Sequence, residues 1–198
     1  MAARNRLPPW HEQLKLANGR ELLIRPIRPD DAEPLRAGFA LLQPDEIRQR
    51  FLYALKELTP EMAQRLTHPD TRREFALVAA EPLPPGEALV GAVARASMND
   101  TGREAEFAIL VSRYINGMGL GRHLMRRLVR WAKGRKLDAL YGDVLEHNNP
   151  MLSLSESLGF RREASDAPGL VRVVLDLKRA APSLPMGGVS TPPAAGRT

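Results

Sequence analysis

Hydrophobic positions in the middle of the chain fall into short runs rich in valine and alanine, a pattern typical of buried β-strands. Three such runs, 75–80, 88–96 and 105–111, are separated by Pro-Pro-Gly and Asn-Asp-Thr-Gly segments that favour turns. The spacing predicts three consecutive strands in an antiparallel meander. Apolar runs at 140–145 and 171–177 predict two further strands of the same sheet.

The first third of the chain predicts a hairpin followed by helices. Asn18-Gly19 divides the residues of 11–27 and is a signal for a two-residue type I′ turn between two short strands. Helical spacing follows over 32–42, and two more helices are expected to begin at Pro44 and at Thr59-Pro60. The helix that begins at Pro44 is expected to carry three apolar residues on one side: Ile47, Phe51 and Leu55.

Helical patterns also occupy the second half of the chain. Apolar residues after position 119 predict the core-facing side of a helix, formed by Leu120, Leu124, Leu128, Trp131 and Ala132. Asn149-Pro150 opens a later helix, with Asn149 as its expected N-cap, and Gly159 ends it.

The predicted order of elements is β, α, β, β, β, α, β, α, β. This order indicates one α+β domain over residues 12–178, built on a mixed sheet. Residues 1–11 are expected to be flexible. Because 180–198 contain seven Pro or Gly residues and a single charged residue, 179–198 are expected to form a disordered tail.

The composition excludes several kinds of chemistry. The chain of 198 residues has no cysteine, which removes disulfides, thiolate nucleophiles and cysteine-bearing zinc sites. Its 29 Lys and Arg against 23 Asp and Glu give a net charge of +6, which favours an anionic partner. We find neither a secretory signal nor an apolar stretch of about 18 residues, so a cytoplasmic protein without membrane contact is expected.

The segment Asn116-Gly117-Met118-Gly119-Leu120-Gly121-Arg122 lies between a predicted strand and a predicted helix. Its glycines allow a ligand to approach the backbone, and the first N–H groups of the helix, the helix dipole and Arg122 favour an anion such as phosphate. The segment has neither the Gly-x-Gly-x-x-Gly of dinucleotide sites nor the Gly-Lys-Ser/Thr of a P-loop. A tight strand-to-helix turn without a ligand is the alternative interpretation.

Alternation along the strand at 104–111 places Glu104 and Glu106 on the same face. Glu106 is nearer the centre of the strand and is flanked by apolar residues. Partial burial is therefore expected to raise its pKa towards the value that a general base needs. Glu104 is the weaker candidate. An ordinary solvated face carrying two carboxylates is the alternative.

Other candidate sites receive less support. The basic residues from Arg126 to Lys136 are expected to form a solvated face, because Trp131 lies on the core side and leaves no stacking platform for nucleic acid. The 4 histidines lack the spacing of metal ligands, so we expect no metal. No serine lies in a Gly-x-Ser-x-Gly motif, which leaves a hydrolase triad unsupported.

Three motifs together resemble the GCN5-related N-acetyltransferase (GNAT) superfamily. They are the glutamate-bearing strand, the glycine loop that opens a helix, and Asn148-Asn149-Pro150-Met151 followed by Leu158-Gly159-Phe160. The resemblance covers residues 21–177 and implies a single domain with a mostly antiparallel central sheet flanked by helices. Segments 19–31 and 103–111 are similar to the acetyltransferase domain of bacterial protein lysine acetyltransferases.

The resemblance implies acetyl-CoA as the donor, direct transfer of its acetyl group, and no metal. It also implies a protein lysine as acceptor, with acyl-CoA-synthetase-like proteins among the candidates. Glu106 is implied as general base, and Asn116 and Asn148 as contacts of the cofactor. The residues implied to hold its diphosphate through backbone N–H groups are Gly117, Met118, Gly119, Leu120, Gly121 and Arg122. The pantetheine arm is implied to pair with the backbone of Ile109, Leu110 and Val111, which diverge from the following strand.

Two positions depart from the family pattern. Asn116 stands where Gln or Arg is usual, which is expected to change cofactor affinity modestly because the loop binds chiefly through backbone groups. Ser155 stands where many members carry a tyrosine general acid, and a serine hydroxyl is a poor acid, so no catalytic acid is assigned. A small amine such as a polyamine or aminoglycoside is the alternative acceptor. A non-catalytic acyl-CoA-binding module is the alternative class of protein.

Overall fold

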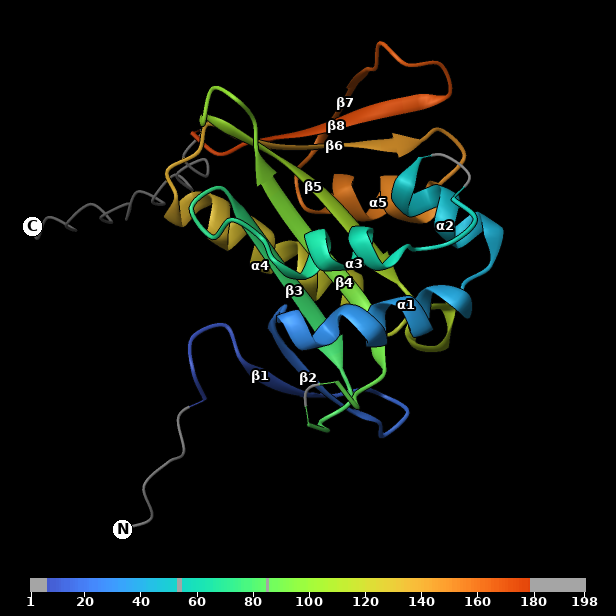
Figure 1. Ribbon diagram of the computed structural model, residues 1–198. Helices are drawn as coiled ribbons and strands as arrows, with labels where there is room; N and C mark the ends of the chain where they lie inside the picture. The colour runs from blue at the N-terminus through green and yellow to red at the C-terminus, as the bar shows by residue number, and fades with distance from the viewer. Residues whose placement is uncertain (1–6, 53–54, 85, 179–198) are drawn as a thin grey trace, which may run out of the picture.

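An eight-stranded sheet forms the centre of the molecule (Figure 1). The computed structural model describes residues 7–52, 55–84 and 86–178. Along the sheet the strands lie in the order β1-β2-β3-β4-β5-β6-β8-β7. Their bounds are β1 Glu12–Lys15, β2 Glu21–Pro26, β3 Glu74–Ala80, β4 Val90–Met98, β5 Glu104–Val111, β6 Ala139–Leu145, β7 Arg161–Ala164 and β8 Leu170–Asp176.

The sheet is mixed and mostly antiparallel, as predicted. Strands β3, β4 and β5 form the expected meander, with Val78 opposite Val93 and Val93 opposite Leu110. Neighbouring strands of the described sheet are antiparallel except for β5 and β6, which run parallel. Parallel strands need a crossover connection, and the long helix predicted after the glycine loop provides it.

Helices cover both faces of the sheet, as Figure 1 shows. One face carries α1 (Ala32–Ala40), α2 (Pro44–Phe51) and α3 (Pro60–Thr67), and the other carries α4 (Leu120–Gly134) and α5 (Asn149–Ser157). The predicted inner side of α4 is buried, and the ring of Trp131 stacks on that of Phe75 at 5.5 Å between centroids. No described helix has both the length and the apolar character needed to cross a membrane.

The hairpin at the start of the chain has a longer turn than predicted. The Leu16 N–H donates to the Arg20 carbonyl at 2.8 Å, and the Gly19 N–H donates to the Leu16 carbonyl at 2.9 Å. Of the two residues expected to have positive φ, Gly19 has it at +83° and Asn18 does not. The loop therefore spans 17–19, a type I turn followed by a left-handed glycine, and the type I′ prediction was wrong.

Three further segments differ from the sequence-based expectations. Helix α2 ends at Phe51 because Leu52 adopts a left-handed conformation with φ of 63°, so Leu55 lies outside this helix. Strand β7 was not predicted, since all four of its side chains are exposed and give no alternation. Trp10, within the segment expected to be flexible, packs its ring 4.6 Å from that of Phe75. Residues 1–6 and the expected tail 179–198 lie outside the described residues.

Candidate active site

Strands β5 and β6 pair at one end and diverge at the other, which opens a cleft between them. Their pairing covers Glu104–Glu106 against Ala139–Tyr141 and then stops. Beyond this point a cleft of about 440 Å³ is bordered by the second half of β5, the glycine loop, the start of α5 and the end of α2. On its other side β5 stays paired with β4 as far as Val111. The backbone of 107–111 thus faces the cleft without a partner strand among those described.

The ring of Phe107 packs against β6 at the point where the two strands diverge. Gly142 of β6 leaves room for Phe107 of β5: a Cβ on Gly142 would lie 2.7–3.0 Å from three ring carbons of Phe107. The Phe107 ring also packs edge-on against Phe160, with 5.5 Å between centroids. Since real Cβ contacts are essentially never this short, only glycine at 142 fits the ring in its observed position.

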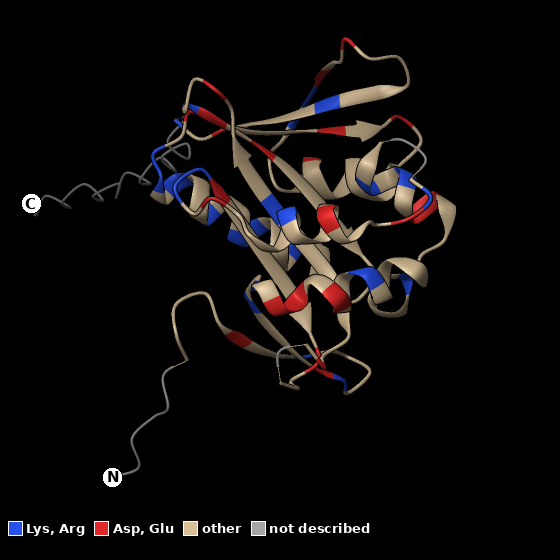
Figure 2. Cartoon of the chain, viewed as in Figure 1, with Lys and Arg blue, Asp and Glu red and all other residues tan. Residues whose placement is uncertain are grey.

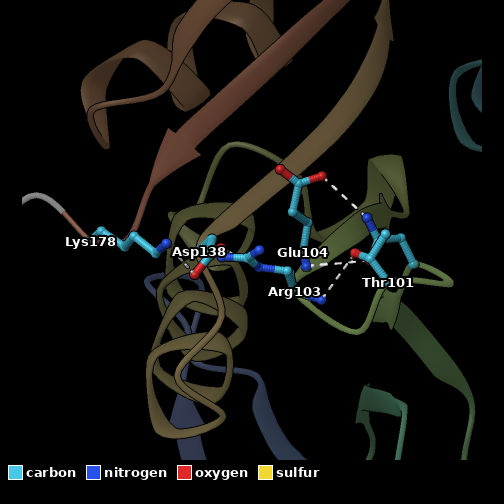
Figure 3. Close-up of polar contacts among 6 residues, drawn as sticks. Thr101, Arg103, Glu104, Asp138 and Lys178 are labelled. Carbon is cyan, nitrogen blue, oxygen red and sulfur yellow. Dashed lines mark hydrogen bonds and ion pairs between the residues drawn. The ribbon is translucent and has the colours of Figure 1, made fainter.

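Charged side chains hold the closed end of the strand pair together (Figure 3). Arg103 Nε donates to Asp138 at 3.0 Å, and Lys178 Nζ lies 2.9 Å from the same carboxylate. The hydrogen bond from Lys178, together with the charge of Arg103, lowers the pKa of Asp138. Glu104 accepts a hydrogen bond from the Asn99 side chain at 3.2 Å. The side chain of Glu104, the first residue of β5, is therefore held by the turn between β4 and β5, whereas Glu106 borders the cleft.

The glycine loop turns sharply into α4 at the cleft. Gly117 and Gly119 have φ of +77° and +79°, and Gly119 is the N-cap of the helix. These positive φ values favour glycine, which has no Cβ to strain the backbone. The N–H groups in the first turn of the helix have no acceptor within the helix itself. This geometry suits an anion at the helix start.

Not every residue of the glycine loop faces the cleft in the same way. Asn116, Gly117, Gly119, Gly121 and Arg122 border it, whereas the side chains of Met118 and Leu120 pack against the core. Asn116 Oδ1 accepts the Gly117 N–H at 2.8 Å, which engages one of the donors expected to face a ligand. Arg122 Nη2 donates to Ser157 Oγ at 2.7 Å and thereby links α4 to α5.

Glu106 faces a neighbouring acid and its arginine partner. It is in register with Tyr141 on β6, and Asp143 lies two residues further along that strand. Arg172 of β8 holds Asp143 through two hydrogen bonds of 3.0 and 2.9 Å. Desolvation by the walls of the cleft raises the pKa of Glu106, as does the charge of Asp143, while Arg172 and Arg50 oppose the shift. The Glu106 carboxylate is exposed to the cleft and has a raised affinity for a proton.

Two residues of β6 that the sequence did not single out, Tyr141 and Asp143, lie across the strands from Glu106. Tyr141 packs beneath the Arg172 guanidinium, which lies 5.0 Å from the ring centroid. Desolvation and the charge of Glu106 raise the pKa of Tyr141, so this phenol stays protonated at neutral pH. Alternation within β6 places Tyr141 and Asp143 on one face and was visible in the sequence. Their register with Glu106 was not visible, because it depends on which strands are neighbours.

Asn148 and Ser155 occupy different sides of α5. Asn148 borders the cleft and is the N-cap of the helix, where its side chain accepts the Met151 N–H at 3.3 Å. The expectation that Asn149 is the N-cap was therefore wrong. Ser155 is fully buried, its hydroxyl has no hydrogen-bond partner among the described residues, and it does not border the cleft.

Substitution of Ser155 with alanine is expected to leave most of the activity intact. The hydroxyl lies outside the cleft, and removal of a buried unpartnered polar group is neutral or stabilising. Steady-state kinetics and thermal unfolding of Ser155→Ala test this. A loss of about a hundredfold in kcat, which corresponds to about 2.7 kcal/mol of barrier, would show that Ser155 participates in the chemistry.

The arrangement provides an anion site at a helix start, a strand edge with free backbone groups, and a carboxylate with a raised pKa beside them. Among the described residues, no three His, Asp or Glu side chains gather as metal ligands. These parts suit a phosphorylated ligand laid along β5 and a proton transfer at Glu106.

Comparisons with known proteins agree with this geometry. A family model described as the acetyltransferase (GNAT) domain matches residues 21–161. Acetyltransferase PA5475 from Pseudomonas aeruginosa is 30% identical over 164 residues, which cover 82% of this chain and 87% of that protein. The GNAT domain of S. lividans PAT has a TM-score of 0.75 and 26% identity, and the match covers 86% of this chain and 99% of that chain.

A more distant structure shares the fold. An N-acetyltransferase from Staphylococcus aureus Mu50 has a TM-score of 0.64 and 20% identity, over 79% of this chain and 99% of that chain. GNAT enzymes transfer the acetyl group of acetyl-CoA to an amine. The family match over most of the described domain, together with the curated relative, shows that this chain belongs to the GNAT acetyltransferase family.

Proposed function

We propose that the chain is a cytoplasmic protein-lysine N-acetyltransferase that binds acetyl-CoA in the cleft between β5 and β6. The observation that carries the proposal is the position of Glu106 on the wall of this cleft, at the point where the two strands separate. The similarity of segments 19–31 and 103–111 to bacterial protein lysine acetyltransferases supports a lysine side chain as the acceptor.

The donor would lie along β5 with its diphosphate at the start of α4. The backbone N–H and C=O groups of Ile109 and Val111 face the β6 side, where no described strand uses them, so the pantetheine amides can pair with them. Those of Leu110, between them, face Val93 of β4. The N–H groups from Met118 to Arg122 would hold the diphosphate, while that of Gly117 is engaged by Asn116. Arg122 adds a positive charge, and Asn148 closes the cleft from α5.

The chemistry requires removal of a proton from the lysine ammonium. Glu106 takes this proton, directly or through one water, and its raised pKa matches it to that role. The neutral amine then attacks the thioester carbonyl, and backbone N–H groups of β5 stabilise the resulting oxyanion. Collapse of this intermediate forms the amide, breaks the carbon–sulfur bond and releases the CoA thiolate, and the second proton of the nitrogen passes to this thiolate or to water. The chain has no cysteine to carry the acetyl group, in agreement with direct transfer.

Transfer of labelled acetyl groups into a desalted bacterial lysate tests the proposed function. The unaltered chain is incubated with labelled acetyl-CoA, the lysate and added polyamines, and label is measured separately in proteins and in small amines. Discrete labelled proteins support a protein acetyltransferase. Label only in small amines would replace the proposed acceptor, and tight binding of acetyl-CoA without any transfer would indicate a binding module.

Substitution of Asp143 with asparagine is expected to move the acidic limb of the pH profile of kcat/KM to lower pH. The charge of Asp143 raises the pKa of Glu106, and Arg172, which Asp143 now pairs, lowers it. The substitution removes the first effect and leaves the second unneutralised, so both changes lower the pKa of Glu106. A base with a lower pKa stays ionised to lower pH.

Rates of transfer at low acceptor concentration, measured across pH, test this expectation. Asp166→Asn is the matched control, because Asp166 is exposed in the turn between β7 and β8. A limb that stays in place in Asp143→Asn, or moves to higher pH, would contradict the electrostatic account of Glu106.

A further inference from the structure

A second cavity lies beside the cleft, beneath the helices of the N-terminal third. It has a volume of about 360 Å³ and is bordered by α1, α3, the end of α2 and strands β4 and β5. This size falls within the range of ligand pockets, about 300–1,000 Å³. The mechanism proposed above makes no use of this cavity.

The lining of the second cavity is aliphatic and suits an uncharged group. Leu35, Leu42, Leu66 and Val93 contribute to it. The wall also carries charged side chains: Arg95 pairs with Glu74 at 2.9 Å, and Arg20 pairs with Glu81 at 3.6 Å. Because Glu81, the carboxylate in the lining, is already paired, an ammonium group would lose its hydration there without gaining an unpaired carboxylate. The cavity therefore favours a hydrocarbon chain over the reacting amine.

The second cavity and the cleft meet at β5. Both are bordered by Leu110, Arg50 and Phe51. Val93 of β4 stands directly opposite Leu110 in the sheet and borders the second cavity. A donor with its diphosphate at the start of α4 and its pantetheine arm along 109–111 would bring its thioester further along β5, towards Glu106. The charge of Arg50 acts on Glu106. Carbon atoms beyond the acetyl methyl would therefore extend past Arg50 and Phe51, which border both spaces, towards the aliphatic lining.

We propose that the second cavity holds the acyl chain of donors longer than acetyl, so that the protein binds and transfers acyl groups such as hexanoyl. The inference rests on the proposed function, because it requires an acyl-CoA in the cleft. The reaction is unchanged: Glu106 receives the first proton of the ammonium, the amine forms an amide bond to the acyl carbon, the carbon–sulfur bond breaks, and CoA leaves as the thiolate, which takes up the second proton directly or from water.

Titration calorimetry with a series of acyl-CoA thioesters and the full chain tests the inference. Each methylene buried is worth about 0.8 kcal/mol, or about fourfold in Kd, and hexanoyl-CoA has four more methylenes than acetyl-CoA. Burial of about half of them is enough to make hexanoyl-CoA bind at least about tenfold more tightly. Equal or weaker binding of hexanoyl-CoA overturns the inference and leaves the proposed function intact. Failure of acetyl-CoA and hexanoyl-CoA alike to bind overturns the proposed function itself.

Val93→Phe localises the effect to the second cavity. It fills the space opposite Leu110 and is expected to remove most of the preference for hexanoyl-CoA while leaving the Kd of acetyl-CoA unchanged. Val129→Phe is the matched control, since Val129 is partly buried on α4, on the opposite face of the sheet. A preference that survives in folded Val93→Phe contradicts the assignment of this cavity. The series on the unaltered chain decides the matter if the variant does not fold.

Transfer kinetics separate the acyl chain from the other possible occupant, an apolar side chain of the acceptor. With the acyl chain in the cavity, Val93→Phe raises the KM of hexanoyl-CoA and leaves the acceptor KM unchanged. A rise in the acceptor KM that is the same for acetyl and hexanoyl donors would assign the cavity to the acceptor and overturn the inference.

Discussion

Substitution of Glu106 with glutamine is expected to lower kcat/KM for acetyl transfer by about 10²–10⁴-fold, the range attributed to a positioned general base. Glutamine keeps the size of the side chain and its place on the wall of the cleft but cannot accept the ammonium proton. The backbone groups of β5 and the start of α4 remain in place, so the Kd of acetyl-CoA is expected to stay the same. Calorimetry and steady-state rates on a purified acceptor separate these two effects.

Glu104→Gln is the matched control for this substitution. Glu104 lies two residues earlier on the same face of β5 but is engaged by Asn99 in the turn to β4. It is expected to retain most of the activity. Equal losses in the two variants, or full activity in Glu106→Gln, would contradict the assignment of the base.

Glu106→Gln is also expected to change the dependence of folding stability on pH. A carboxyl group whose pKa is raised in the folded state binds its proton more tightly there than in the unfolded chain. Folding stability therefore falls as pH rises from the pKa of the unfolded state through that of the folded state. Glu106→Gln lacks this penalty, so its Tm at neutral pH should exceed that of the unaltered chain, and the difference should vanish in acid.

Substitution of Gly142 with alanine is expected to destabilise the fold and disturb the cleft together. The new methyl group would lie 2.7–3.0 Å from the Phe107 ring, which is itself packed against Phe160. Overpacking of this kind costs about 1–3 kcal/mol. For a chain of this size each kcal/mol lowers Tm by about 2–4 °C. Because displacement of the ring changes the divergence of β5 and β6, the affinity for acetyl-CoA should fall as well.

Gly134→Ala provides the matched control. Gly134 ends α4, a Cβ there meets nothing within 4 Å, and its φ is not in the left-handed region. Alanine at this position should leave affinity unchanged and stabilise slightly. The double variant Phe107→Leu with Gly142→Ala should recover part of the stability, since the smaller side chain removes the clash. An unchanged Tm in Gly142→Ala would show that the close packing of the Phe107 ring on Gly142 does not constrain the fold.

The sequence predicted most of the fold where the pattern of buried positions was strong. The inner side of α4, the meander of β3, β4 and β5, and the α+β class were all readable from periodicity. Strand β7 could not be predicted in this way, because all of its side chains are exposed and form no periodic pattern. Only its pairing with β8 identifies it as a strand. The hairpin turn was misread because Asn18-Gly19 is compatible with both a two-residue and a three-residue loop, and the hydrogen bond from Leu16 to Arg20 distinguishes them.

Parts of the candidate site were predictable to the extent that they depend on local sequence. The glycine loop and Glu106 were selected from residue type and alternation, and the structure places them at one cleft. The pairing of Asp143 with Arg172 and the fit of Phe107 over Gly142 join residues distant in the chain. Such contacts depend on strand order and register, which a single sequence does not specify.

The central claim is that acetyl-CoA lies along the unpaired edge of β5 with its diphosphate at the start of α4. Hydrogen exchange of the full chain, with and without acetyl-CoA, tests it most directly. The account predicts slower exchange of the amides of Ile109, Val111 and 118–122, in the unaltered chain and equally in Glu106→Gln. Slower exchange confined to other segments, or no change at saturating acetyl-CoA, would contradict it.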